Sequence, residues 1–464
     1  MHRVQTFTAQ MLDALDLRGA VDDPIIEGIG ALPSAFPVTD FASASIATAA
    51  TGIAALLARR SGDRPPAITV DRRLASWWLQ LSIRPLGWRL PPPWDAIAGD
   101  YACRDGWIRL HTNAPHHRAA AEAVLGRHAD RAGMADAVRR WDKTALESAV
   151  VEAGGCAAEM RSIDEWQHHP QGRAVADEPL VDVATRAGTR RAEWRLEPMR
   201  PLSGIRVLDL TRVLAGPIAT RFLAGYGAEV LRIDPLHWDE PSVVPEVNPG
   251  KRSARLDLRT DTGRAALRTL LADADVFVHG YRPGALAALG FGAAARRALN
   301  PALVDVSLDA YGWSGPWRGR RGFDSLVQMS NGIADAGMKW RDADKPVPLP
   351  AQALDHATGY LMAAAVLRGL LMRVDSGDTL TARLSLARTA ALLIEQPRTD
   401  DARGLDEETA EDREPAIERT PWGDAQRLRP PVRIDGTPMH WDLPAHALGG
   451  DEPVWTTGTA SFTR

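Results

Sequence analysis

Residues 205–234 read IRVLDLTRVLAGPIATRFLAGYGAEVLRID, and this stretch decides the fold. The apolar runs at 205–210 and 228–234 are typical of buried strands. Between them, Pro217 stands in the first turn of an expected helix over 217–225, a position where proline is tolerated. A strand, a helix and a second strand in direct succession predict a parallel β-α-β unit.

The pattern of apolar strands separated by helical segments continues downstream. The segments DVFVH (275–279) and LVDVSL (303–308) predict two further strands, so an α/β fold with a parallel, doubly wound sheet is expected over residues 200–395. Upstream, residues 79–196 mix a strand at 106–111 with helices near 117–139 and 143–153, which predicts a smaller α+β domain. Residues 396–464 are expected to form a tail that packs back on the large domain.

Composition excludes several classes of protein. At 464 residues, the chain is long enough for two or three domains, and 45% hydrophobic with 25% charged residues is typical of globular proteins. A net charge of −4 is not typical of nucleic-acid-binding proteins, which concentrate positive charge on one face. The two cysteines are too few for a disulfide framework. The first twenty residues show no signal peptide, so a cytoplasmic protein is expected. The uncharged stretch 41–58 is interpreted as a buried helix and not as a membrane span.

The N-terminal segment, residues 1–78, contains an internal similarity. The stretch that starts at Asp40 aligns without a gap with the one that starts at Asp355, and 11 of the 39 aligned pairs are identical. Each stretch reads as an aspartate, a long apolar helix, a Ser-Gly-Asp turn and a short extended segment. This pattern predicts an internal duplication. Aspartate directly before a helix is also a preferred N-cap, so capping is expected for Asp40 and remains an alternative for Asp355.

Two sequence features argue against common cofactors. The first β-α turn, 209–217, lacks GxGxxG, so neither a nicotinamide nor a flavin cofactor is expected. The histidines have no HExxH spacing and no cysteine partners, so no metal site is expected; a polar loop near an interdomain cleft is favoured instead for His111, His116, His117, His168 and His169.

Seven ordered stretches resemble motifs of one known family. PLSGIRVLDLTRVLAGP, AEVLRID, NPGKRSARLDL, YRPGALAALGFG, NPALVDVSLDAYGWSGPW, GFDSLVQMSNG and LDHATGYLMAAA are similar to successive motifs of the family III CoA-transferases. The resemblance implies a Rossmann-like large domain that binds coenzyme A, a smaller domain and an interlocked homodimer. It also implies an acyl-CoA donor and a carboxylic acid acceptor as substrates.

The resemblance further implies roles for individual residues. Asp355 falls at the position of the nucleophilic carboxylate, which forms a covalent aspartyl-CoA thioester; with an ordinary pKa near 3.9 it would be ionised at pH 7. Backbone N–H groups of Val213, Leu214 and Ala215 would stabilise the oxyanions. The cations expected to meet phosphates of coenzyme A are Arg232, Lys251 and Arg282.

Departures from the family pattern keep two alternatives open. Phe323 stands where the racemases of the family carry a histidine, and a phenyl ring cannot move a proton, which disfavours an acyl-CoA racemase or isomerase. The small domain precedes the large-domain motifs, and Leu214 and Gly312 stand where formyl-CoA transferase has polar groups. A catalytically silent CoA-binding subunit is therefore the second interpretation. The sequence does not identify the acyl group.

Overall fold

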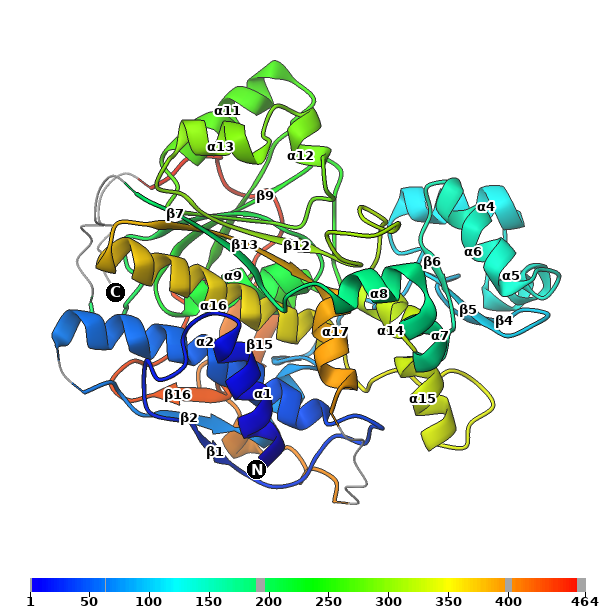
Figure 1. Cartoon of the computed structure of the whole chain (residues 1–464), viewed down its shortest axis with the longest axis horizontal. Coiled ribbons are helices and arrows are strands. Elements are labelled where there is room, and N and C mark those ends of the chain that lie inside the picture. The colour runs from blue at the N-terminus through cyan, green and yellow to red at the C-terminus, as the bar shows by residue number, and fades with distance from the viewer. Residues whose placement is uncertain (1, 63, 189–196, 397–402, 457–464) are drawn as a thin grey trace.

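The fold is built around one sheet of seven strands (Figure 1). The computed structural model describes residues 2–62, 64–188, 197–396 and 403–456. The strands lie in the order β10-β9-β8-β11-β12-β13-β7. Their bounds are β7 Asp182–Arg186, β8 Arg206–Leu210, β9 Glu229–Asp234, β10 Lys251–Arg255, β11 Val276–His279, β12 Val304–Asp309 and β13 Thr379–Ser385. Strands β8 to β13 pair in parallel, and β7 runs antiparallel to β13. The predicted α/β class is confirmed.

The strand order reverses at a single point between β8 and β11. From β8 the chain moves outward to β9 and β10, then returns to the other side of β8 and continues through β11, β12 and β13. Numbered along the chain, these parallel strands lie in the order 3-2-1-4-5-6, which is found in doubly wound sheets. Loops that leave neighbouring strands in opposite directions open a crevice at the carboxyl ends of β8 and β11, where ligands bind in such sheets.

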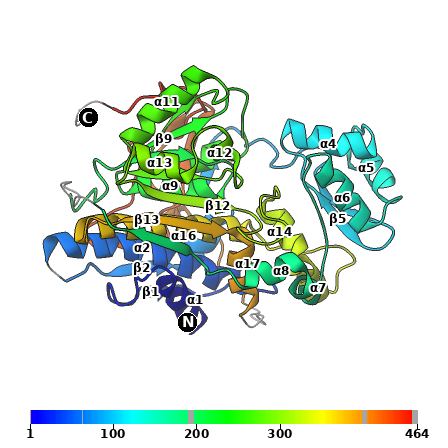
Figure 2. The ribbon, with the colours of Figure 1, turned by 45° about the horizontal axis from the view of Figure 1, so that its top comes forward.

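Helices cover both faces of the sheet (Figure 2). Side chains alternate along each strand: Val207 and Val276 pack into the core with helices α9 and α16, whereas Leu208 and Phe277 pack into the core with α11. The bounds of the helices of this part of the chain are α9 Ala215–Gly225, α10 Val244–Val247, α11 Asp261–Ala272, α12 Ala285–Ala288, α13 Ala293–Leu299, α14 Asp324–Ser330, α15 Ile333–Trp340, α16 Ala353–Asp375 and α17 Leu386–Ile394.

A smaller unit lies beside the sheet and has its own core (Figure 1). An antiparallel sheet of β4, β5 and β6 packs on α4, α5 and α6, and α7 and α8 lead back to β7. The bounds are β4 Gly99–Ala102, β5 Trp107–Leu110, β6 Ala157–Glu159, α4 Pro115–Leu125, α5 Arg131–Val138, α6 Lys143–Glu152, α7 Ile163–His168 and α8 Pro170–Ala176. The core of this unit runs from Ile97 to Ala157. The predicted range 79–196 is wider, because its β7 belongs to the large sheet; residues 189–196 lie outside the described residues.

The two ends of the chain form shared sheets. Strand β16 (Val432–Ile434) pairs with β2 (Ile68–Asp71), which also pairs with β1 (Ile25–Glu27). Strand β15 (Gly423–Arg427) pairs with β14 (Glu418–Thr420) and with β3 (Ile83–Pro85). The tail thus joins strands from residues 25–85, and it also reaches the large sheet, where the side chain of Trp455 is buried.

The N-terminal helices α1 (His2–Asp13), α2 (Val38–Ser61) and α3 (Arg72–Trp78) pack below the sheet, and α2 lies along α16 (Figure 1). By length and apolar composition α2 and α16 could each span a membrane, but most of both is buried in the chain, as expected for 41–58. Their N-caps, Pro37 (φ −75°, ψ 60°) and Gln352 (φ −78°, ψ 62°), have nearly the same conformation. A strand and a helix follow each: β2 and α3 after α2, and β13 and α17 after α16.

Candidate active site

A cavity of about 390 Å³ lies at the carboxyl ends of β8, β11 and β12. This is the position at which a doubly wound sheet binds its ligand, beside the reversal of strand order. The smaller unit closes one side through α4. The lining residues are His116, His117, Leu210, Thr211, Arg212, Val213, Ala215, Trp238, Gly280, Tyr281, Arg282, Ala285, Leu308, Asp309, Ala310, Arg320, Arg321, Gly322, Phe323, Asp355 and Leu386.

Asp355 reaches this cavity from the first turn of α16. It is the third residue of the helix and is 8% exposed. Its backbone N–H donates to Oδ2 of Asp324 at 2.9 Å, so Asp324 and not Asp355 satisfies the helix terminus. The N-cap of α16 is Gln352, which makes no side-chain capping bond. The capping alternative for Asp355 is therefore wrong.

The two carboxyl groups, Asp355 and Asp324, disfavour each other's ionisation. Burial, and after it the charge of Asp324, raises the pKa of Asp355 well above its usual range. Burial raises the pKa of Asp324 to about 6. The expectation that Asp355 has an ordinary pKa is wrong, because the sequence does not show that a second carboxyl group lies against it. Once ionised, a carboxylate with a raised pKa is the stronger nucleophile.

Asp40 holds the equivalent position in α2 but lies outside the cavity. It is the third residue of its helix, and the N-cap is Pro37. Its Oδ1 accepts a hydrogen bond from Nη2 of Arg72 at 2.7 Å. The predicted capping role of Asp40 is therefore also wrong: the carboxylate is used in an ion pair that joins α2 to α3.

The N-terminus of α9 points at the cavity close to Asp355. A Cβ atom on Gly359, one turn after Asp355, would lie 2.4 Å from the carbonyl oxygen of Ala215. Only glycine permits this approach of the two helices. Ala215 lines the cavity, and the N–H groups in the first turn of α9 have no acceptor within the helix, so the terminus can receive an anion.

The turn before α9 is strained. Val213 has φ +64°, a left-handed conformation that a β-branched residue rarely adopts. Its N–H donates to Oε1 of Glu240 at 2.8 Å. Of the three predicted oxyanion donors, Val213 is therefore already engaged, while Leu214 is the N-cap of α9 and Ala215 its first residue.

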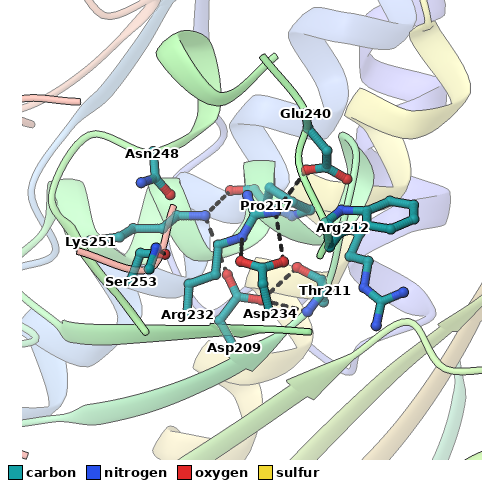
Figure 3. Close-up of polar contacts among 12 residues, drawn as sticks. Asp209, Thr211, Arg212, Pro217, Arg232, Asp234, Glu240, Asn248, Lys251 and Ser253 are labelled. Atoms are coloured by element: carbon teal, nitrogen blue, oxygen red, sulfur yellow. Dashed lines mark hydrogen bonds and ion pairs between the residues drawn. The ribbon is translucent and has the colours of Figure 1, made fainter. Parts of the chain in front are cut away.

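A buried network of charges lies beneath this turn (Figure 3). Arg232 on β9 donates from Nε to Asp234 at 2.8 Å and from Nη2 to Glu240 at 2.7 Å, with its side chain fully buried. Lys251 on β10 donates from Nζ to the carbonyl oxygen of Pro217 at 2.9 Å and lies 3.3 Å from Oδ2 of Asp209. Burial lowers the pKa of Lys251 to about 8.

These contacts correct two predictions. Arg232 and Lys251 were expected to bind phosphates of coenzyme A, yet both are 0% exposed and neither lines the cavity. They face inward because carboxylates from other segments, Asp209 on β8 and Glu240 before α10, reach them. Their role is to hold β8, β9 and β10 and the turn at Val213 together.

Arg282 is the predicted cation that lines the cavity. Its Nη1 lies 3.4 Å from the carbonyl oxygen of Gly319. Together with Arg320 and Arg321 it also lines an adjoining cavity of about 540 Å³. Burial, and then the charge of Arg321, lowers the pKa of Arg282. Two guanidinium groups that repel each other form a wall suited to an anionic ligand.

Phe323 contacts two histidines of the smaller unit. Its ring stacks on His111 with centroids 3.8 Å apart, and His117 meets it edge-on at 5.8 Å. His116 and His117 line the cavity between the units, near the interdomain cleft as expected, but they lie in the first turn of α4 and not in a loop. His168 and His169 lie further away, at the junction of α7 and α8. Among the described residues, no group of His, Cys, Asp or Glu is placed to hold a metal ion.

Sequence reasoning missed Asp309 and the role of Asp324. Asp309 ends β12, lines the cavity and accepts hydrogen bonds from the N–H groups of Tyr311 and Gly312 at 2.8 and 3.0 Å. Burial raises its pKa to about 7. A signal was available for Asp309, because acidic residues at the carboxyl ends of parallel strands face the ligand crevice. For Asp324, only the fold brings α14 against the start of α16.

Comparisons with known proteins match the part of the chain that forms the large sheet. Residues 202–430 match the model of CoA-transferase family III. The probable fatty acyl-CoA transferase Rv3272 of Mycobacterium tuberculosis is 35% identical over 194 residues, covering 39% of this chain and 49% of the relative. The succinyl-CoA:glutarate CoA-transferase of Mus musculus is 35% identical over 205 residues, covering 41% and 47%.

A crystal structure of Rv3272 matches with 32% sequence identity, covers 42% of this chain and 57% of that one, and has a TM-score of 0.37. The chain spans about half the length of the curated relatives that it matches. The matched region contains β8 to β13, the turn before α9 and Asp355. Through residues 202–430, just under half of its length, the chain is similar to CoA-transferase family III.

Proposed function

We propose that the protein transfers coenzyme A from an acyl-CoA donor to a carboxylic acid acceptor, with Asp355 as the covalent nucleophile. The observation that carries this proposal is the position of Asp355: a carboxylate on the rim of the ligand crevice, beside the N-terminus of α9, inside the region that matches the family. The transfer needs no ATP, because each new bond conserves the energy of the thioester.

The proposed reaction has four steps. The ionised Asp355 carboxylate attacks the thioester carbonyl carbon and the C–S bond breaks. The CoA thiolate departs, and a mixed anhydride of Asp355 and the donor acyl group is formed. The thiolate then attacks the carbonyl carbon of Asp355, which releases the donor acid and forms the aspartyl-CoA thioester. The acceptor carboxylate attacks this thioester and displaces the thiolate, which finally takes the acceptor acyl group and frees Asp355.

The surroundings of Asp355 suit these steps. Each tetrahedral intermediate carries an oxyanion, and the proposed donors are the N–H groups of Leu214, the N-cap of α9, and Ala215, its first residue. Arg282 is the proposed contact for the anionic part of coenzyme A, since it lines both adjoining cavities. We also propose that the protein is cytoplasmic and that it forms a homodimer.

The proposal is tested by trapping the enzyme-bound intermediate. Purified protein is incubated with acetyl-CoA or succinyl-CoA, quenched with hydroxylamine and measured by intact-protein mass spectrometry. An adduct on the wild type that is absent from Asp355→Asn supports the proposal. The matched control is Asp40→Asn, since Asp40 holds the same position in α2 but lies outside the cavity; this variant should form the adduct. No adduct in wild-type protein that binds both CoA thioesters would overturn the transferase and favour a silent CoA-binding subunit.

A further inference from the structure

The smaller unit brings a second reactive side chain to the cavity that holds Asp355. His117 is the third residue of α4 and lines this cavity. It is 4% exposed, and neither ring nitrogen has a hydrogen-bond partner in the part of the chain that the structure describes. A buried polar atom without a hydrogen-bond partner destabilises the fold. A side chain held in this way beside a cavity is a candidate for contact with the ligand.

The residues around His117 keep its imidazole neutral. Burial, followed by the charges of His116, Arg321 and Arg282, lowers the pKa of His117 to about 3. Its place in the first turn of α4 acts in the same direction, because the N-terminus of a helix disfavours a cation. His111, which stacks on Phe323, also has a pKa lowered to about 3 by burial. A neutral imidazole always carries one N–H donor and cannot lose it at physiological pH.

The turn before α9 offers few free backbone donors to the cavity. Glu240 already accepts the N–H of Val213, which leaves the terminus of α9 as the only backbone donor proposed above. Leu214 and Phe323 supply no polar side chain. Among the cavity-lining residues around Asp355, His117 adds a neutral N–H from the opposite unit of the chain.

We infer that His117 is a catalytic residue that donates a hydrogen bond from its neutral imidazole to the carbonyl oxygen of the acyl thioester as negative charge develops there. No proton is transferred: the oxyanion is stabilised by the N–H and collapses again as the C–S bond breaks. The inference rests on the proposed transferase function. It assigns part of the catalytic site to the smaller unit, outside residues 202–430.

The test compares single-turnover rates of adduct formation on Asp355 in wild type, His117→Ala, His117→Gln and His117→Asn. Loss of one donor of this kind lowers the rate by roughly 100- to 1,000-fold. His117→Ala should show this loss with little change in KM. The glutamine amide can stand in for Nε2 and the asparagine amide for Nδ1, so one of these variants should recover activity and identify the donor nitrogen. The matched control is His168→Ala, an exposed histidine outside the cavity.

A second readout, the pH dependence of the loss, separates hydrogen-bond donation from proton transfer, while recovery in the glutamine or asparagine variant separates catalysis from support of the fold. A neutral donor predicts that the loss in His117→Ala is constant between about pH 5 and pH 9, since His117 does not titrate there. An unchanged adduct rate in folded His117→Ala would overturn the inference and leave the transferase intact. A loss that varies with pH would overturn it as well, because it would assign His117 to proton transfer. Failure of the wild type to form any adduct would instead overturn the proposed function.

Discussion

The strained turn at Val213 offers a sharp test of how the buried charges serve the site. Glu240→Ala removes the acceptor of the Val213 N–H and one of the two carboxylate partners of Arg232. The left-handed conformation of a β-branched residue costs roughly 1–3 kcal/mol, and a hydrogen bond to a carboxylate contributes roughly 1.5–3 kcal/mol. In the wild type these two contributions nearly balance. Without Glu240 the strain is unopposed, so the active turn loses about 2 kcal/mol, or roughly 30-fold in population.

The assay is kcat/KM for CoA transfer, with thermal unfolding measured in parallel. Arg232 keeps Asp234 at 2.8 Å, so Glu240→Ala should remain folded. The second change, Val213→Gly, removes the strain because glycine adopts positive φ without a steric cost. The double variant should therefore regain most of the 30-fold loss. If the double variant is no more active than Glu240→Ala, Glu240 does not act through the conformation of Val213 and the reasoning is refuted.

Three further outcomes are expected. Attack requires ionised Asp355, so the kcat/KM of the wild type should rise with pH. Asp324→Asn removes the neighbouring negative charge that raises the pKa of Asp355, so the midpoint of the pH-rate profile should move to lower pH. An unmoved midpoint would contradict the coupling of the two carboxyl groups. Arg232→Met leaves buried carboxylates unpaired and should lower the free energy of unfolding by about 3–5 kcal/mol in a denaturant titration. CoA binding by the folded variant, measured by calorimetry, should be unchanged. Weaker binding would instead indicate a direct contact between Arg232 and coenzyme A. Gly52→Ala places a Cβ atom 2.7 Å from a leucine of α16 and should cost about 1–3 kcal/mol in thermal unfolding, while Gly404→Ala, with open space around it, should not.

The large sheet could be predicted wherever strands are apolar. The segments expected at 205–210, 228–234, 275–279 and 303–308 correspond to β8, β9, β11 and β12. Strand β10 has the sequence KRSAR and lacks an apolar pattern. It is a strand because Lys251 pairs with Asp209 and because the N–H of Ser253 donates to the side chain of Asp451 in the tail. Such partners come from distant segments, which local periodicity does not record.

The presence of Asp355 in the candidate site was predictable from the sequence, and the electrostatics of the site were not. The motif around Asp355 placed this carboxyl in the cavity, and RPG placed Arg282 there. A sequence does not show whether a cation at a strand end faces a ligand or a carboxylate on the next strand, which is why Arg232 was misassigned. In the same way, the pKa of Asp355 depends on Asp324, which only the packing of α14 against α16 brings near.

The contact between α2 and α16 has a consequence for how this part of the chain can vary. Gly52 packs against Leu367, and the two residues are 315 positions apart, which is also the offset between the aligned stretches. If two identical helices packed around a two-fold axis, each residue on the axis would meet its own copy. Glycine against glycine would leave a void, and leucine against leucine would clash. Because both helices belong to one polypeptide, a large residue can fit a small one, and each side can mutate independently of the other.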